Sequence, residues 1–90
     1  MTVFIFAGTT EGRELALLFS QNGVRCTVSV ATEYGASLLP KAERLTVLHG
    51  RLSHEEMAEK FSQNHYDFVI DATHPFATEV SKEIKKACNR

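Results

Sequence analysis

The 90-residue chain has room for one small domain and not for a second hydrophobic core. Its 43% hydrophobic and 23% charged residues are typical of a soluble globular protein. The formal net charge of −1 argues against nucleic-acid binding, which usually requires an overall positive field. The N-terminal apolar run stops at Gly8, too early for a secretory signal or a membrane span. We therefore expect a cytoplasmic protein with neither nucleic acid nor membrane as a partner.

The cysteines and histidines show no metal-ligand spacing. Cys26 and Cys88 lie singly and far apart, so we expect two reduced, packed thiols. His49, His54 and His65 cluster neither with each other nor with the cysteines, so we interpret them as surface or strand-end residues and expect no metal.

The first half of the chain alternates strand and helix patterns. Residues 3–7 form a continuous apolar run that predicts a strand buried on both faces. Residues 11–22 carry apolar side chains at helical spacing, and Gly23 follows as a left-handed residue that ends the helix. Residues 25–31, rich in threonine and valine, predict a second strand.

The middle of the chain predicts a short turn, a strand and a capped helix. Residues 32–39 suggest one helical turn, and residues 45–49 a third strand. Ser53 and Glu56 have the spacing of a capping box, in which each side chain bonds the other residue's free amide. The helix that follows places Met57 and Phe61 on one face.

The last part predicts a strand at residues 68–72 and a helix with Pro75 in its first turn. The apolar stripe of this helix comprises Phe76, Val80, Ile84 and Ala87. The residues expected to face outward are Lys82, Glu83, Lys85 and Lys86.

This alternation predicts an α/β fold: a Rossmann-like, open parallel sheet of about four strands in the order 3-2-1-4, with crossover helices. The chain stops at residues 87–90 in mid-helix, without a cap or a breaker, which we interpret as a truncation. Ligands of such sheets bind at the carboxyl ends of the strands, where the crossovers reverse direction.

The loop after the first strand is a candidate phosphate site. Gly8 permits a tight turn, and the amides after it open a helix whose N-terminus attracts phosphate. The dinucleotide fingerprint G-x-G-x-x-G nevertheless fails, with Thr10 and Arg13 in place of its second and third glycines. Glu11 places a negative charge there that suits a ribose hydroxyl better than a phosphate. A capped turn without a ligand remains the alternative.

The loop after the fourth strand contains Thr73, His74 and Pro75. Histidine is the side chain most easily poised to exchange a proton near neutral pH, so His74 is a candidate catalytic residue. The alternative is a histidine that only caps the last helix. The position expected to hold the adenosine ribose, at the end of the second strand, carries Thr32 and Glu33.

Together the two loops resemble the precorrin-6A, or cobalt-precorrin-6A, reductase family of cobalamin biosynthesis. Residues 6–16, Phe-Ala-Gly-Thr-Thr-Glu-Gly-Arg-Glu-Leu-Ala, are similar to that family's opening strand, loop and helix. Residues 69–77, Val-Ile-Asp-Ala-Thr-His-Pro-Phe-Ala, are similar to its most distinctive signature. Residues 30–35 and 48–52 resemble further stretches. The resemblance covers nearly the whole chain but only the N-terminal part of a family member.

The resemblance implies an oxidoreductase acting on CH–CH groups, which transfers hydride from NADPH to one ring double bond of its tetrapyrrole-derived substrate. Glu33 stands where several members carry an arginine suited to a 2′-phosphate, which leaves NADH open as the cofactor. Members continue into a second lobe absent here, with cofactor and macrocycle between the lobes. We therefore expect residues 1–90 to be an N-terminal nucleotide-binding domain, inactive alone. The metallation state of the substrate and the oligomeric state stay open.

The resemblance also implies roles for individual residues. His74 is the one catalytic candidate, as a proton donor or a substrate contact. The residues expected to bind the cofactor are Gly8, Thr9, Thr10, Glu11 and Arg13 near the phosphates, Thr32 near the adenosine ribose, and Thr73, His74 and Pro75 near the nicotinamide.

Two other functions compete with this interpretation. A non-catalytic nucleotide-sensing module would continue into a dimerisation or DNA-binding element instead of a second α/β lobe. A sugar-nucleotide epimerase or short-chain dehydrogenase needs a Tyr-x-x-x-Lys pair, but Leu38 and Ile70 follow Tyr34 and Tyr66 at that spacing.

Overall fold

The computed structural model describes residues 1–73 and 78–88 and contains four strands and four helices in alternation. They are β1 (Thr2–Ala7), α1 (Thr10–Gln21), β2 (Arg25–Val30), α2 (Glu33–Ser37), β3 (Leu45–His49), α3 (His54–Gln63), β4 (Phe68–Ala72) and α4 (Thr78–Cys88). The third and fourth strands have the predicted bounds. The first two strands differ from their predicted bounds by one residue at one end, and the first helix is shifted by one residue at both ends.

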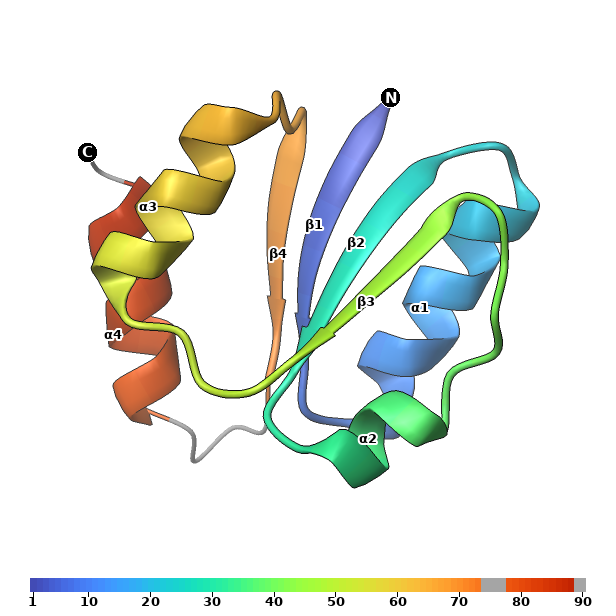
Figure 1. Cartoon of the computed structure of the whole chain (residues 1–90), viewed down its shortest axis with the longest axis horizontal. Helices are drawn as coiled ribbons and strands as arrows, with labels where there is room; N and C mark the ends of the chain where they lie inside the picture. The colour runs from blue at the N-terminus through green and yellow to red at the C-terminus, as the bar shows by residue number, and fades with distance from the viewer. Residues whose placement is uncertain (74–77, 89–90) are drawn as a thin grey trace.

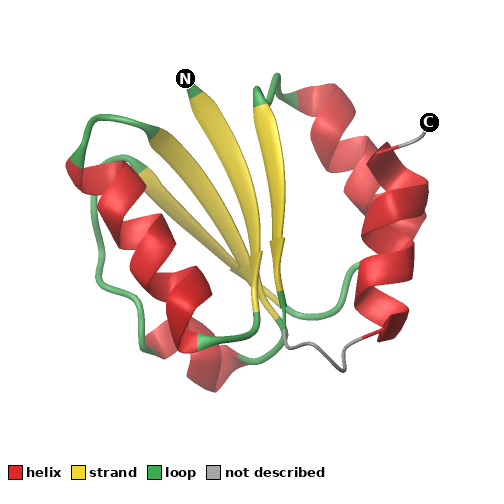
Figure 2. Cartoon of the chain, turned by 180° about the vertical axis from the view of Figure 1, so that it is seen from behind, coloured by secondary structure: helices red, strands yellow, loops and turns green. Residues whose placement is uncertain are grey.

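The sheet is parallel throughout, with the order β3-β2-β1-β4 that the sequence predicts. The helices α1 and α2 cover one face, and α3 and α4 cover the other (Figures 1 and 2). The chain changes face after β3, so the next strand pairs with β1 and the carboxyl ends of β1 and β4 lie side by side.

Alternation along β1 divides the core into two layers. Val3, Ile5 and Ala7 point toward α1, whereas Phe4 and Phe6 point toward α3 and α4. All five residues are buried, as the prediction of a strand covered on both faces requires. Each side of the sheet therefore has its own hydrophobic core.

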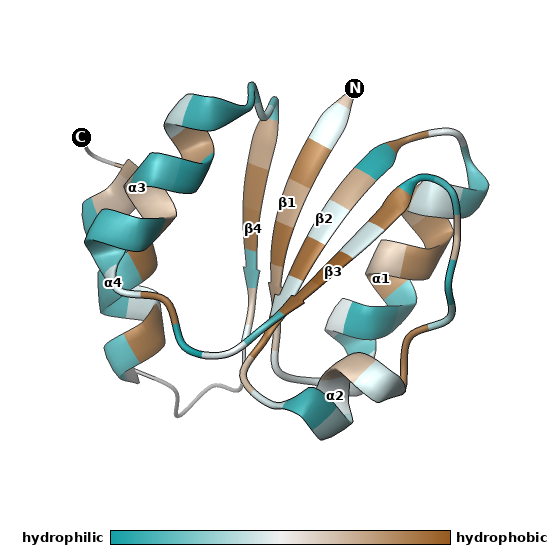
Figure 3. Cartoon of the chain, viewed as in Figure 1, coloured by the Kyte–Doolittle hydropathy of each residue, from teal (hydrophilic) through white to brown (hydrophobic). Residues whose placement is uncertain are grey.

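The layer under α3 and α4 is aromatic. The Phe4 ring packs nearly perpendicular to the rings of Phe61 and Tyr66, at centroid distances of 5.3 and 5.2 Å. Met57 and Phe61 both pack into this layer, which confirms that they share one helix face. Hydrophobic residues are frequent along the strands, while much of the ribbon of α3 and α4 carries hydrophilic residues (Figure 3). Over the described ranges, the helices are too short or too polar to cross a membrane.

The helix ends confirm two predictions from the sequence. Ser53 and Glu56 form a capping box, with Ser53 Oγ accepting from the Glu56 amide at 3.2 Å and Glu56 Oε1 accepting from the Ser53 amide at 3.1 Å. Gly23 has a φ of 80° just after α1, a conformation that favours glycine. These local signals define where the helices stop and start.

Two predictions about side-chain positions are wrong. Cys26 is buried as expected, but Cys88 is exposed, because it lies at the last turn of α4 on the side away from the core. Glu83 was expected to face solvent, but it is partly buried between α4 and α3. The predicted stripe on α4 does pack inward through Val80, Ile84 and Ala87. Pro75 and Phe76 lie outside the described residues.

Candidate functional site

The carboxyl ends of all four strands meet at one edge of the sheet, where open α/β sheets bind ligands. The loop after β1 is joined there to the end of β4. The Ala72 carbonyl accepts from the Gly8 amide at 3.2 Å and from Thr9 Oγ1 at 3.2 Å. Thr9 also caps α1, since its Oγ1 accepts from the Gly12 amide at 3.3 Å. Gly8 and Thr9 therefore position the loop through contacts with the protein itself.

Gly12 lets α1 approach the sheet closely. A Cβ atom at this position would lie 3.0 Å from the Ala7 Cβ, 3.1 Å from the Ala7 Cα and 3.1 Å from the Ala72 Cβ. This is the role of the third glycine in the dinucleotide fingerprint, shifted here by one residue. Matching the fingerprint letter by letter missed Gly12. The signal available in the sequence was a glycine four residues after Gly8, within the first turn of the helix.

The exposed end of α1 offers groups suited to an anion. A helix cannot bond its first amides internally, so the N–H groups of Thr10 and Glu11 lie at the positive end of the helix dipole. Arg13 Nη2 donates to Thr10 Oγ1 at 3.2 Å, which places a guanidinium and a hydroxyl together over this first turn. Glu11 is exposed in the same turn, and its charge opposes a phosphate unless it points toward a hydroxyl donor.

The end of β4 contains a polar cluster that the sequence did not single out. Asp71 Oδ1 accepts from the amide and hydroxyl of Thr73 at 3.1 and 2.5 Å, and Asp71 Oδ2 accepts from Ser81 Oγ at 2.6 Å. Partial burial raises the pKa of Asp71, but the hydrogen bonds from Ser81 and Thr73 outweigh burial and hold that pKa below its usual value. The cluster fixes Thr73 between β4 and α4.

His74 and Pro75, the two other predicted residues of this loop, lie outside the described residues. At the end of β2, Thr32 caps α2, with its Oγ1 accepting from the Gly35 amide at 3.0 Å. Glu33 begins α2 and is exposed. The loops carrying Gly8 and Thr73 are thus brought together, whereas Thr32 and Glu33 lie at the start of a separate helix.

A pocket of about 220 Å³ opens at the same edge, on the face covered by α3 and α4. The ends of β1 and β2 and the segment just after β3 form one wall, and α3 and α4 form the other. Gly8 and Thr73 both line it, so the pocket adjoins both candidate loops. Phe6 and Met57 contribute buried apolar surface, and Arg51, just after β3, contributes a charge.

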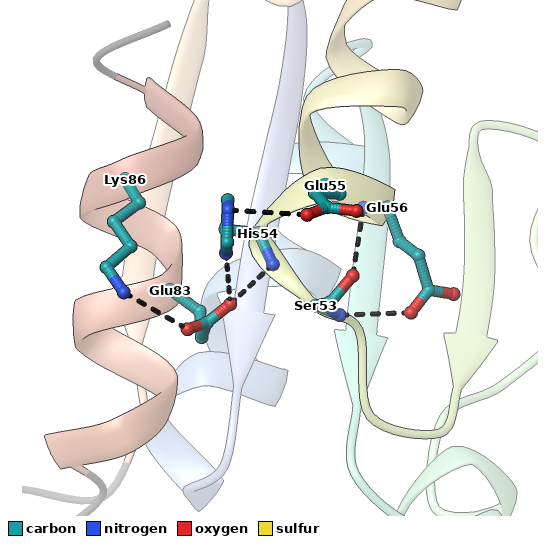
Figure 4. A network of polar contacts seen from close by, with 6 residues as sticks. All are labelled: Ser53, His54, Glu55, Glu56, Glu83 and Lys86. Carbon is teal, nitrogen blue, oxygen red and sulfur yellow. Dashed lines mark hydrogen bonds and ion pairs between the residues drawn. The ribbon is translucent and has the colours of Figure 1, made fainter.

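A polar network joins the two helices beside this pocket (Figure 4). Glu83 Oε2 accepts from the His54 amide at 2.6 Å and contacts the His54 ring Nδ1 at 2.8 Å, while Glu83 Oε1 lies 3.8 Å from Lys86 Nζ. The hydrogen bonds from His54, with a smaller contribution from Lys86, hold the pKa of Glu83 below its usual value. The network ties α3 to α4 and holds one wall of the pocket in place. Within residues 1–73 and 78–88, no three His, Cys, Asp or Glu side chains are grouped to bind a metal.

Comparison with known proteins agrees with this arrangement. The family model described as precorrin-6x reductase CbiJ/CobK matches residues 2–90. The cobalt-precorrin-6A reductase of Priestia megaterium is 36% identical over 80 residues, which span 89% of this chain and 31% of that protein. The precorrin-6A reductase of Rhodobacter capsulatus is 32% identical over 87 residues, which span 96% and 34%.

Among solved structures, a CobK precorrin-6A reductase superposes with a TM-score of 0.81 at 30% identity. The superposition covers 99% of this chain and 35% of that one. The chain therefore spans about a third of the length of the proteins it matches. Because the family model extends over nearly all of it, the chain belongs to the precorrin-6x reductase family.

Proposed function

We propose that residues 1–90 are the cofactor-binding domain of a reductase in cobalamin biosynthesis. The reaction is hydride transfer from a reduced nicotinamide dinucleotide, NADPH or NADH, to a ring double bond of precorrin-6A or cobalt-precorrin-6A. The observation that carries this proposal is the family match over residues 2–90, combined with two loops that meet beside one pocket. We further propose that residues 1–90 are inactive alone, because they match only about a third of the length of the relatives.

The residues around the first turn of α1 fit a pyrophosphate. The amides of Thr10 and Glu11, the Thr10 hydroxyl and the Arg13 guanidinium supply donors on one exposed surface. Gly12 brings this turn close to the sheet, as a dinucleotide site requires. Gly8 and Thr9 act indirectly, by holding the loop in position.

The remaining roles follow the order of the strands along this edge. We assign Thr32, which follows β2, to the adenosine side of the cofactor, and Thr73, which follows β4, to the nicotinamide side. The same nicotinamide role is assigned to His74 and Pro75 on the resemblance alone. When bound, the cofactor supplies the hydride. The protein orients the cofactor, excludes water and, through His74, delivers a proton or contacts the substrate.

The first test is a calorimetric titration of the full-length gene product with NADP⁺ and with NAD⁺, followed by a turnover assay with precorrin-6A and its cobalt form. Saturable binding of one dinucleotide, together with reduction of either macrocycle, is the expected result. If the full-length protein binds neither NADP⁺ nor NAD⁺ at millimolar concentration, the proposal is refuted.

The role of His74 is tested by His74→Ala in the full-length protein. We expect a larger loss of turnover than of stability, because the side chain acts on the reacting groups and not on the core. Unchanged turnover with a lowered melting temperature would make His74 a helix cap.

A further inference from the structure

We propose that a polar pocket at the amino edge of the sheet binds a small oxyanion, namely a phosphate or carboxylate group, between Arg25 and Arg44. The pocket lies where the strands begin, at the opposite edge from the loops that carry Gly8 and Thr73 (Figure 1). β2 has six residues and rises roughly 3.3 Å per residue, so the two edges lie roughly 17 Å apart. A ligand in this pocket therefore leaves the proposed cofactor site free.

The pocket has a size and a lining that suit a small polar ligand. Its volume of about 300 Å³ lies at the lower end of the range for small-molecule sites, roughly 300–1,000 Å³. The amino ends of β2 and β3 line it together with the loop between α3 and β4. Thr27 Oγ1 and Tyr66 OH lie 3.3 Å apart in this lining, so one hydroxyl donates to the other and the second hydroxyl hydrogen stays available to a ligand. The Asn64 side chain adds a further donor group.

Arg25 and Arg44 stand side by side at the start of β2 and just before β3. Cys26 pairs with Leu45, and the Cys26 amide donates to the Arg44 carbonyl at 2.8 Å. Like charges at neighbouring positions of two strands repel each other. Within residues 1–73 and 78–88, neither arginine forms an ion pair. An oxyanion between the two guanidinium groups would remove this repulsion, and each group is suited to bidentate bonds with its oxygens.

The charges around the pocket leave a positive balance. Glu43 lines the pocket and opposes an anion, but the two arginines outnumber it. The nearby Asp67 carboxylate is already engaged, since its Oδ2 accepts from the Thr2 amide at 2.8 Å and its Oδ1 lies 3.3 Å from His65 Nε2. These contacts reduce the repulsion that Asp67 exerts on an anion. The lining therefore favours a negatively charged ligand, and Glu43 limits how tightly it binds.

The test is a calorimetric titration of the full-length protein with inorganic phosphate and with acetate at constant ionic strength, comparing wild type, Arg25→Gln, Arg44→Gln and Lys41→Gln. Loss of a charged hydrogen bond predicts about 10- to 100-fold weaker binding to each arginine variant. Lys41→Gln is the matched control, because Lys41 is exposed, lies three residues before Arg44 and lines a different pocket. This control should bind like wild type. Tighter binding of phosphate than of acetate would identify a phosphate site, and the reverse order a carboxylate site.

Three further measurements separate a binding role from a structural one. In chloride buffer, Arg25→Gln and Arg44→Gln should unfold at the same temperature as wild type or higher, because each removes one of two repelling charges. Tyr66→Phe keeps the ring in the aromatic layer and loses only the hydroxyl, so it should bind the anion about 2- to 10-fold more weakly. Glu43→Gln removes the opposing charge and should bind it more tightly than wild type.

Two results would overturn the proposal of an anion site at the amino edge. The first is a wild type that binds neither anion, or binds them no better than Arg25→Gln and Arg44→Gln do. The second is binding that is lost in Arg13→Gln but kept in Arg25→Gln, which would place the anion at the first turn of α1. Neither result changes dinucleotide binding or turnover by the wild type, so the reductase proposal is tested separately.

Discussion

The close packing of α1 on the sheet can be tested by Gly12→Ala. The added Cβ would lie 3.0–3.1 Å from three atoms of Ala7 and Ala72, one of them a backbone Cα. None of these atoms belongs to a flexible side chain, so the helix must move away from the sheet. Overpacking of this kind costs about 2–3 kcal/mol, while replacing a helical glycine by alanine returns about 1 kcal/mol. The expected net loss of unfolding free energy is about 1–2 kcal/mol.

Urea unfolding followed by far-UV circular dichroism measures this loss, and a thermal scan should show a fall of about 4–16 °C for a domain of this size. Gly35→Ala in α2 is the control, because its added Cβ would meet the Thr32 Oγ1 at 3.3 Å and the Val30 Cβ at 3.5 Å, with no contact as short as those at Gly12. This variant should stay within about 0.5 kcal/mol of wild type. A Gly12→Ala protein as stable as wild type would refute the claim that the helix is held in direct contact with β1 and β4.

Three further predictions concern the core, the pH dependence and the thiols. Phe4→Ala should cost about 3–5 kcal/mol in urea unfolding, because the ring is fully buried among aromatic neighbours. The folded-state pKa of Asp71 lies below its unfolded value near 3.8, so the stability that this carboxylate contributes is complete above that pH and is lost as the pH falls further. Ser81→Ala removes one of the hydrogen bonds that lower this pKa. The variant should therefore show a smaller difference between its unfolding free energies at about pH 6 and about pH 3 than the wild type shows. Burial raises the pKa of Cys26 to about 11, so in the native protein Ellman's reagent should modify the exposed Cys88 first, and equally fast modification of both thiols would contradict the packing.

Much of the fold could be predicted from local patterns. The bounds of β3 and β4, the capping box at Ser53 and the positive φ of Gly23 all follow from residues within one turn or one strand of each other. The strand order followed as well, because right-handed crossovers leave few arrangements for this alternation of elements. The fingerprint G-x-G-x-x-G was a poorer guide. It places the glycine that packs against the sheet at position 13, which is Arg13 here, whereas Gly12 has that packing role in the structure.

Side-chain partners on different elements could not be predicted in this way. Ser81 lies ten residues after the Asp71 carboxylate that it bonds, and His54 lies 29 residues before its partner Glu83. Helix periodicity predicted an exposed Glu83, because it counts positions around one helix and cannot include a second helix packed beside it.

The amino-acid sequence by itself determined the elements, their order and the edge of the sheet at which the loops converge, because backbone conformation and the 2.0 and 3.6 residue periods are local properties. The tertiary structure decided what those loops contact. The Thr9 hydroxyl caps α1 and donates a hydrogen bond to the Ala72 carbonyl. Arg51 lines the apolar pocket between the strand ends and α3 and α4, whereas Glu33 lines a different pocket. The physical reason is that both outcomes depend on how closely separate elements pack, and separation along the chain does not encode that distance.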